Sequence, residues 1–331
     1  MAGYHVYGIG NALLDMVYEV DEDFLRESGI DKGLMTLIDE NRQNELLEMV
    51  GNLSTLKSCG GSAANTMIAV AQMGGRSFYS CKAGDDAEGK FYYEDMQKNG
   101  VDSNLKDGLM DGVTGKCIVF ITPDADRTMN TYLGITENFS TNELREEKIK
   151  QAKYIYVEGY LVTSDTGRAA AIEAVQLAKK HGARISMTFS DPAMVKYFKD
   201  GINEIMGGKI DLLFCNEDEA KSYTGCGDIS DAAEKLKEVA STFAITLGAQ
   251  GAIVFDGSSM NSVPGKKVKA IDTNGAGDLF AGSFLYAITH GHDFVKAANL
   301  ACAASARLVT VGGARLTKDQ VVEIKKDVIG E

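Results

Sequence analysis

Apolar and polar positions follow two periods along this chain, and their alternation predicts a parallel sheet covered by helices. Short apolar runs predict buried strands at 4–10, 78–82, 154–157, 184–189, 211–214, 243–247 and 252–255. Stretches with helical spacing lie among them, at 39–50, 62–73, 90–98, 167–181, 194–205 and 318–327, with two more ending at 290 and 309. Strands that alternate with helices are typical of α/β folds. Ligands of such sheets bind beyond the carboxyl ends of the strands.

Two regions break this alternation with extra short strands. Residues 17–20 and 34–38 look like strands on either side of an acidic, helix-like insert. Residues 115–121 and 128–133 predict a hairpin that turns at 123–126. Arg127 follows the turn, and a solvated loop charge is the plain interpretation of a single arginine there.

Composition and charge narrow the functional class. The 331 residues suffice for one large α/β domain or two smaller ones, and 44% hydrophobic with 24% charged residues is typical of a folded soluble protein. The net charge of −13 disfavours nucleic acid as a partner, because phosphate backbones are bound by basic surfaces. No uncharged apolar run reaches membrane-spanning length, and the first residues lack a signal-peptide pattern. We therefore expect a cytoplasmic protein that binds no membrane.

The six cysteines carry no metal or disulfide pattern. They are Cys59, Cys81, Cys117, Cys215, Cys226 and Cys302. No two form a CxxC pair, and none lies near a histidine at zinc-ligand spacing. Reduced, buried thiols are the expectation.

The stretch Asp272-Thr-Asn-Gly-Ala-Gly-Asp278 carries the strongest chemical signal. Gly275, Ala276 and Gly277 lie where a helix should begin, so their N–H groups can hold an anion. A carboxylate at Asp278 makes sense there as a general base, with the backbone holding developing phosphate charge. The alternative is a glycine-rich turn in which Asp278 is an ordinary first-turn acid.

Three further stretches carry candidate binding residues, and the last two adjoin predicted strands. Gly60 and Gly61 allow close backbone approach before a helix for which Ser62 is the expected N-cap, and Asn65 falls in its first turn. Asn216 to Glu219 begins another helix, where a carboxylate can organise magnesium waters or simply favour the helix dipole. Thr246, Gly248 and Gly251 form a turn suited to a nucleotide phosphate.

Two other glycine motifs imitate nucleotide-binding loops, the first a weak signal and the second a decoy. Gly8-Ile-Gly10 lacks the third glycine of a dinucleotide fingerprint, because Leu13 stands at that position. Residues 84–90 imitate a GxxxxGK phosphate loop, but Phe91 replaces the serine or threonine that would hold magnesium.

Taken together, these motifs resemble those of the PfkB, or ribokinase-like, family of sugar and nucleoside kinases along nearly the whole chain. The ordered set is Asn11…Asp15, GGSAAN at 60–65, NEDE at 216–219, TLGAQG at 246–251 and DTNGAGD at 272–278. Within the family, GNALLD and DRTMNTYLG are most similar to the adenosine kinase branch.

The resemblance implies a fold. We expect one domain over residues 1–331, built as a doubly wound, mainly parallel sheet with helices on both faces. A small β-sheet lid would come from about 16–38 and 112–135. The family's lids either cover the site within a monomer or pair with a partner's lid, so a monomer and a lid-mediated homodimer are both open.

The resemblance also implies roles for the residues singled out above. The family transfers the γ-phosphate of ATP to a primary hydroxymethyl group, with magnesium and, in many members, stimulation by potassium. The implied catalytic residues are Asp278 as base, the anion hole Gly275, Ala276 and Gly277, and Arg127 from the lid. Substrate hydroxyls would meet Asn11, Asp15, Gly60, Gly61 and Asn65. ATP would meet Asn216, Thr246, Gly248, Gly251 and Asn299, with Glu219 holding magnesium through water. Potassium would lie near Asp272 and the turn at 311–313.

Substrate identity stays open at this stage. Positions that stack the purine in animal-type adenosine kinases fall near Leu161 and Met194, which are apolar but not aromatic, with Tyr160 adjacent. The leading hypothesis is an adenosine kinase. The alternatives are a sugar kinase of the fructokinase, ribokinase or 2-keto-3-deoxygluconate kinase type, an oxidoreductase built on Gly8-Ile-Gly10, and a non-catalytic binding protein on the same fold.

Overall fold

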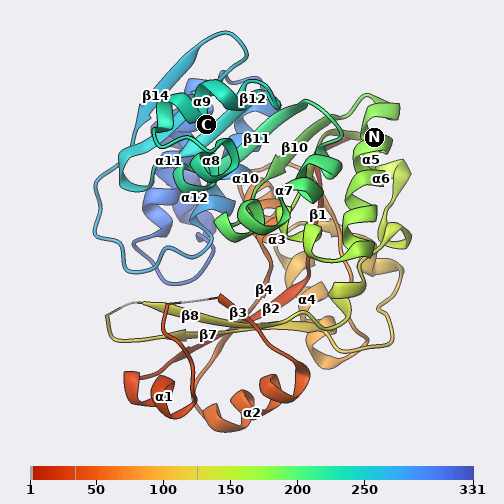
Figure 1. Ribbon diagram of the computed structural model, residues 1–331, viewed down its shortest axis with the longest axis vertical. Helices are drawn as coiled ribbons and strands as arrows, with labels where there is room; N and C mark the ends of the chain where they lie inside the picture. The colour runs from red at the N-terminus through yellow and green to blue at the C-terminus, as the bar shows by residue number, and fades with distance from the viewer. Residues whose placement is uncertain (1–2, 34, 125) are drawn as a thin grey trace.

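A nine-stranded sheet forms the body of the molecule in the computed structural model, which describes residues 3–33, 35–124 and 126–331 (Figure 1). Its spatial order is β14-β13-β12-β11-β10-β9-β1-β5-β6, and only β13 and β14 run antiparallel to their neighbours. The strands are β1 (Tyr4–Ile9), β5 (Ser77–Ser80), β6 (Asp102–Ser103), β9 (Ala152–Val157), β10 (Arg184–Thr188), β11 (Ile210–Asn216), β12 (Ala240–Thr246), β13 (Gly251–Phe255) and β14 (Met260–Pro264).

Helices cover both faces of this sheet, because its strands are apolar on both sides. One core cluster includes buried side chains of α3 (Ser62–Gln72), α4 (Ala87–Lys98), α10 (Ala276–Thr289), α11 (Phe294–Leu308) and α12 (Lys318–Ile329). The opposite cluster includes those of α5 (Glu146–Ile149), α6 (Asp165–His181), α7 (Pro192–Met206), α8 (Glu217–Thr224) and α9 (Ile229–Leu236). In β1, Val6 belongs to the first cluster while Tyr7 and Ile9 belong to the second, as a two-residue period requires. The predicted doubly wound fold is confirmed.

A second, five-stranded sheet of order β3-β8-β7-β2-β4 lies below the body in Figure 1. Its strands are β2 (Leu13–Glu19), β3 (Met35–Leu37), β4 (Leu56–Gly60), β7 (Gly115–Ile121) and β8 (Arg127–Tyr132). We call this sheet, with α1 (Glu22–Glu27) and α2 (Glu40–Val50), the lid. The predicted hairpin is present as β7 and β8, whereas β4 lies outside the ranges expected for the lid. Leu34 of the predicted strand 34–38 and Ala125 of the predicted turn 123–126 lie outside the described residues. Met1 and Ala2, at the start where no signal peptide is expected, lie outside them as well.

The two faces of the lid sheet differ in polarity because its side chains alternate along each strand. Leu14, Met16 and Tyr18 of β2 pack with Ile118 and Phe120 of β7 against buried side chains of α1 and α2. The intervening positions, which include Asp15 and Cys117, line a cavity on the other face of the sheet. The lid helices therefore bury one face of the sheet and leave the other free to cover the site.

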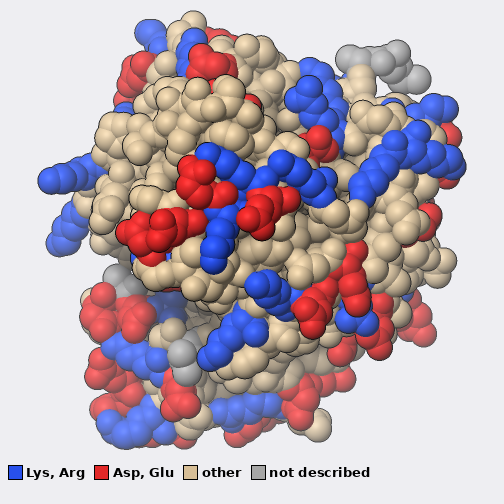
Figure 2. All heavy atoms as spheres, turned by 45° about the horizontal axis from the view of Figure 1, so that its top comes forward, with Lys and Arg blue, Asp and Glu red and all other residues tan. Residues whose placement is uncertain are grey.

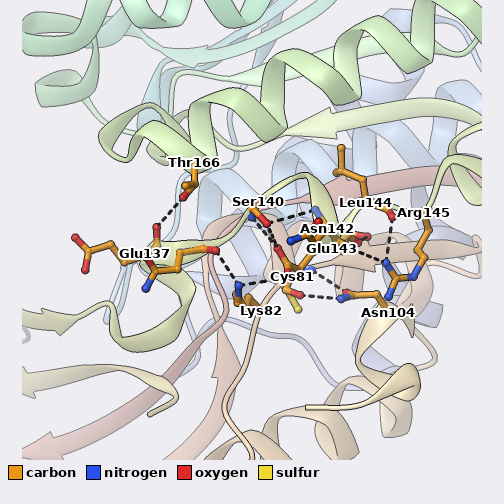
Figure 3. A network of polar contacts seen from close by, with 12 residues as sticks. Cys81, Lys82, Asn104, Glu137, Ser140, Asn142, Glu143, Leu144, Arg145 and Thr166 are labelled. Carbon is orange, nitrogen blue, oxygen red and sulfur yellow. Dashed lines mark hydrogen bonds and ion pairs between the residues drawn. The ribbon is translucent and has the colours of Figure 1, made fainter. Parts of the chain in front are cut away.

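The segment that returns from the lid to the body is held by the polar network in Figure 3. This network surrounds two short 3-10 turns, η2 (Gly134–Asn138) and η3 (Thr141–Glu143). Lys82 Nζ donates to the carbonyl oxygen of Asn138 at 2.9 Å and lies 3.4 Å from Oε1 of Glu143, whose side chain is 2% exposed. The backbone N–H and the hydroxyl of Ser140 both donate to Oε2 of Glu143, at 2.7 and 2.9 Å. These bonds fix the point at which the lid joins the body.

None of the helices in the described part of the chain is long and apolar enough to cross a membrane. On the face drawn in Figure 2, acidic and basic side chains are interspersed rather than gathered by sign.

Candidate active site

A cavity of about 660 Å³ lies between the lid and the carboxyl ends of the large sheet. Figure 2 shows the surface hollowed where the lid meets the body. The lid contributes side chains of β2, β7 and β8 to its wall, and the body contributes the ends of β9, β10, β11 and β12 together with the starts of α3 and α10. The cavity thus occupies the place where open α/β sheets bind ligands.

Asp278 lies in the first turn of α10 and opens onto this cavity. Its Oδ1 accepts a hydrogen bond from the hydroxyl of Ser62 at 2.7 Å, and its Oδ2 accepts one from Nδ2 of Asn65 at 3.2 Å. Burial raises the pKa of Asp278 to about 6, against the opposing effect of these two bonds. A carboxylate with this pKa can take a proton near neutral pH.

The helix start beside Asp278 is open for an anion. Gly275 is the N-cap of α10 with φ of 69°, a left-handed conformation that glycine adopts without strain. A Cβ added to Gly277 would meet no atom within 4 Å, so free space borders the backbone there. Gly275, Ala276 and Gly277 all line the cavity. The first N–H groups of this fourteen-residue helix can therefore point at a bound phosphoryl group.

A second buried carboxylate, Asp15 on β2, lies at the lid side of the cavity. Burial raises its pKa to about 7, while the guanidinium groups of Arg315 and Arg127 lower it. No described residue donates a hydrogen bond to its carboxylate. Gly60 makes room for it, because a Cβ at Gly60 would come within 2.3 Å of the Asp15 carboxyl carbon. A buried acceptor without a partner that faces a cavity is suited to ligand hydroxyls.

Glu158, which the sequence analysis did not select, completes the acidic lining. It follows β9, and its Oε1 accepts from both the backbone N–H and Nδ2 of Asn11, each at 3.2 Å. Its Oε2 accepts from the N–H of Ala63 at 2.8 Å. Burial raises its pKa to about 7. Glu158 therefore ties Asn11 to the start of α3, and only its place after a buried strand could have marked it.

Asn216 and Glu219 form a reciprocal cap at the start of α8, on the body side of the cavity. The N–H and Nδ2 of Asn216 donate to Oε2 and Oε1 of Glu219, at 3.0 and 2.9 Å. Burial raises the pKa of Glu219 to about 7. Within the described residues, no group of three or more His, Cys, Asp or Glu side chains could hold a metal ion. Because magnesium keeps most of its waters and shares phosphate oxygens, one carboxylate and one amide oxygen are compatible with it.

The predicted phosphate turn is present, but only part of it reaches the cavity. Thr246 lines the wall. Gly248 and Gly251 have φ of 56° and 101° and close the turn after β12, although neither is among the lining residues. Asn299 lies exposed on α11, where its Nδ2 donates to the carbonyl oxygen of Val295 at 2.9 Å.

The lid is joined to the body beside the glycine run through Arg127. Its Nη2 donates to Oδ2 of Asp272, which also accepts from the N–H of Gly313 at 2.7 Å. Arg127 is 10% exposed in its side chain, and its Nε and Nη1 are buried without a partner. The two remaining donor groups of this guanidinium therefore lie in the cavity wall ready for an acceptor.

Comparison with known proteins agrees with this geometry. Residues 35–320 match the model of the pfkB family carbohydrate kinases. This chain belongs to the pfkB family. It is a kinase, and the family implies that ATP is a substrate.

Relatives of this pfkB kinase include nucleoside and sugar kinases. Adenosine kinase 1 of Arabidopsis thaliana is 26% identical over 327 residues, covering 90% of this chain and 92% of its own. The structure of the adenosine kinase from Sinorhizobium meliloti has a TM-score of 0.90 at 32% identity and covers 98% of this chain and 100% of its own. A probable sugar kinase from Rhizobium etli CFN 42 has the same TM-score at 30% identity and covers 99% of both chains.

Two sequence expectations for this kinase are corrected by the geometry. Ser62 does not cap α3, because Gly61 is the N-cap with φ of 96° and the Ser62 hydroxyl reaches Asp278 instead. Leu161 is buried in the core away from the cavity wall, whereas Tyr160 and Met194 line it.

The two glycine motifs at 8–10 and 84–90 have structural roles in this kinase. After Gly10 the chain continues into strand β2 rather than a helix, and a Cβ at Gly10 would lie 2.4 Å from Oε2 of Glu158. In the stretch 84–90, the N–H groups of Gly84 and Gly89 are bonded to Thr114 and Asp86 side chains. Neither stretch is therefore free to cradle phosphates.

Proposed function

We propose that this enzyme phosphorylates the primary hydroxymethyl group of a nucleoside, with adenosine as its main substrate and ATP as the donor. One observation carries the nucleoside assignment. Besides its polar residues, the cavity wall includes apolar side chains from both parts of the molecule: Met35, Met129 and Leu133 from the lid, and Met194 from the body beside Tyr160. A flat base could pack against these apolar side chains, whereas a free sugar offers little apolar surface to cover them.

In the proposed reaction, Asp278 accepts the proton of the substrate hydroxyl. The freed oxygen forms a bond to the γ-phosphorus of ATP as the bond from that phosphorus to the bridging oxygen breaks, and ADP leaves. The N–H groups of the run from Gly275 to Gly277 stabilise the charge on the γ-phosphoryl oxygens. Asp15 orients the sugar hydroxyls with Asn11, Gly61 and Asn65, while the lid excludes water.

The ions belong to the same proposal. Asn216 and Glu219 would hold magnesium waters beside the ATP phosphates, where the ion neutralises charge. Glu219→Gln keeps the reciprocal cap but removes the charge, so we expect it to need more magnesium for half-maximal activity. An unchanged magnesium requirement would contradict this role. If potassium binds near Asp272 and the turn at 311–313, activity should be higher in potassium chloride than in sodium chloride. Equal activity in the two salts would contradict this binding.

Release of ADP over a panel of acceptors tests the main proposal. Adenosine, inosine, ribose, fructose and 2-keto-3-deoxygluconate are compared, with Asp278→Asn enzyme as the blank. We expect adenosine to be the best acceptor. Met194→Lys, which places a charge among the apolar side chains of the cavity wall, should raise the KM for adenosine about tenfold or more and affect a free sugar less.

A sugar kinase is the second candidate, because Glu158 adds another carboxylate to the polar residues of the cavity wall. Turnover of a sugar without turnover of a nucleoside would favour it. Tight NADH binding without ATP binding would favour an oxidoreductase instead. ATP binding without turnover of any acceptor would favour a non-catalytic protein.

A further inference from the structure

The hydroxyl of Ser62 connects two helices at the centre of the active site. Because Gly61 is the N-cap of α3, Ser62 is the first helical residue, and its side chain has no capping bond to make. Its hydroxyl instead donates to Oδ1 of Asp278, 216 residues further along the chain, at 2.7 Å. The helices approach closely at this end, since a Cβ on Gly282 of α10 would come within 2.6 Å of the carbonyl oxygen of Thr66 on α3.

Both oxygens of the Asp278 carboxylate are held from α3. Ser62 bonds to Oδ1, and Asn65 bonds to Oδ2 from one turn further along the same helix. Two donors at different oxygens fix the rotation of the carboxylate about its own axis. Each oxygen keeps a further lone pair for a ligand. The orientation of the Asp278 carboxylate is therefore set by α3 as well as by its own helix, α10.

We propose that Ser62 is a positioning residue that holds the Asp278 carboxylate in the orientation needed to take the substrate proton. This inference rests on the proposed function and deepens it. Ser62 acts through Asp278 and is not itself a proton carrier.

The surroundings of Asp278 explain why such a bond matters. Burial disfavours the charged form, and the bond from Ser62 is the largest effect that opposes it. The charge of Asp278 raises the pKa of Asp15 on β2, of Tyr156 and Glu158 at β9, and of Tyr160 in η4 (Gly159–Thr163). None of these carries positive charge. Loss of the Ser62 hydroxyl should therefore raise the pKa of Asp278.

The pH dependence of kcat tests the inference. In Ser62→Ala we expect kcat to fall about tenfold and the acidic limb of the profile to move up by roughly half to one pH unit, with little change in KM. Since the site carboxylates titrate together, the displacement between variants is the readout. In Ser62→Thr, which keeps the hydroxyl, the acidic limb of the kcat profile should lie at the same pH as in the wild type. Ser283→Ala is the matched control, because it removes a buried, unpartnered hydroxyl from α10.

A raised KM with an unmoved limb in Ser62→Ala would overturn the inference, because Ser62 would then simply contact the substrate. Unchanged kcat and limb would overturn it as well.

A thermal-melt cycle tests the contact without catalysis. When folding raises the pKa of an acidic group, the protein becomes less stable as pH increases through that raised pKa. The gap in Tm between wild type and Ser62→Ala should therefore be small at pH 5 and wider at pH 8. It should lose this pH dependence in the Asp278→Asn background. A gap that is equal at both pH values contradicts the inference. Absence of turnover by the wild type, with the expected melts intact, would count against the proposed function alone.

Discussion

At the scale of single residues, the site contains several carboxylates whose charged form would be more stable in water than in this buried cavity. Asp15, Glu158, Glu219 and Asp278 all have pKa values raised by burial, to between about 6 and about 7. Hydrogen-bond donors oppose this increase at Glu158, Glu219 and Asp278, and two arginines oppose it at Asp15. The concentration of such carboxylates at one cavity is typical of a site where chemistry takes precedence over stability.

The general base gives the first prediction. Asp278→Asn should lower turnover roughly 10²–10⁴-fold, the usual effect of losing a positioned base. Because the pKa of Asp278 is about 6, wild-type kcat should also fall as pH drops below 6. Steady-state kinetics across pH provide the measurement. Asp319→Asn is the control, since Asp319 is also an acidic residue in the first turn of a helix, α12. Turnover near the wild-type rate in Asp278→Asn would refute the assigned role.

Asp15 gives a prediction about stability. Its pKa rises from 3.8 to about 7 on folding, so its contribution is favourable below pH 4 and is lost as pH increases through 7. Asp15→Asn should therefore stabilise the protein by about 1–3 kcal/mol at pH 8, with the gain disappearing towards pH 4. Thermal melts at several pH values measure this, with the exposed Asp111→Asn as control. A variant less stable than wild type at pH 8 would be the opposite result.

At the scale of elements, the connection from the lid to the body depends on one buried ion pair. Lys82 is the second residue after β5, and Glu143 lies in η3 (Figure 3). Ser140 alone would remain as donor to the carboxylate of Glu143 if Lys82 were lost. The pair thus links the sheet to the segment that follows the lid.

Lys82→Ala should cost about 1–3 kcal/mol of unfolding free energy, because it leaves a buried carboxylate short of a partner. Urea unfolding measures the loss. Lys90→Ala removes a comparable pair with Asp85 in which both side chains are more than half exposed, and it should have almost no effect. Equal losses in the two variants would show that burial of the Lys82 pair is irrelevant.

At the scale of the whole molecule, the site exists only where the lid meets the body. Arg127 spans this junction, and its guanidinium bonds to Asp272 with two donor groups left over. We infer that the same side chain turns these donors to the γ-phosphate when ATP is bound. Closure of the lid and stabilisation of the transferred charge would then depend on one residue.

Arg127→Ala should lower kcat about 10²–10³-fold, with a smaller effect on the KM for ATP, because the arginine contacts charge that develops during transfer. Arg127→Lys should be intermediate, since lysine keeps the charge without the forked donors. Arg26→Ala, a lid arginine that is 69% exposed, serves as control. Loss of ATP affinity with unchanged kcat would show that Arg127 binds ATP without assisting transfer.

The sequence by itself determined the layered fold, the lid hairpin and many of the residues that line the cavity. Period-two and helical patterns identify buried strands and covering helices, because burial acts on each segment locally. Motifs read from the sequence also pointed to Asp15, Asn65, Glu219 and Asp278, which all line the cavity.

Only the tertiary structure decided which side chains meet across long separations. From the sequence, Ser62 is expected to be a helix cap, but packing of α3 against α10 brings its hydroxyl to Asp278. Glu158 follows a strand and has no local signal of function, but the fold places it in hydrogen-bonding contact with Asn11 and the start of α3. Strand β4 belongs to the lid because it pairs antiparallel with the edge of β2. Such contacts depend on the arrangement of whole elements, and the sequence near each residue carries no record of its distant partner.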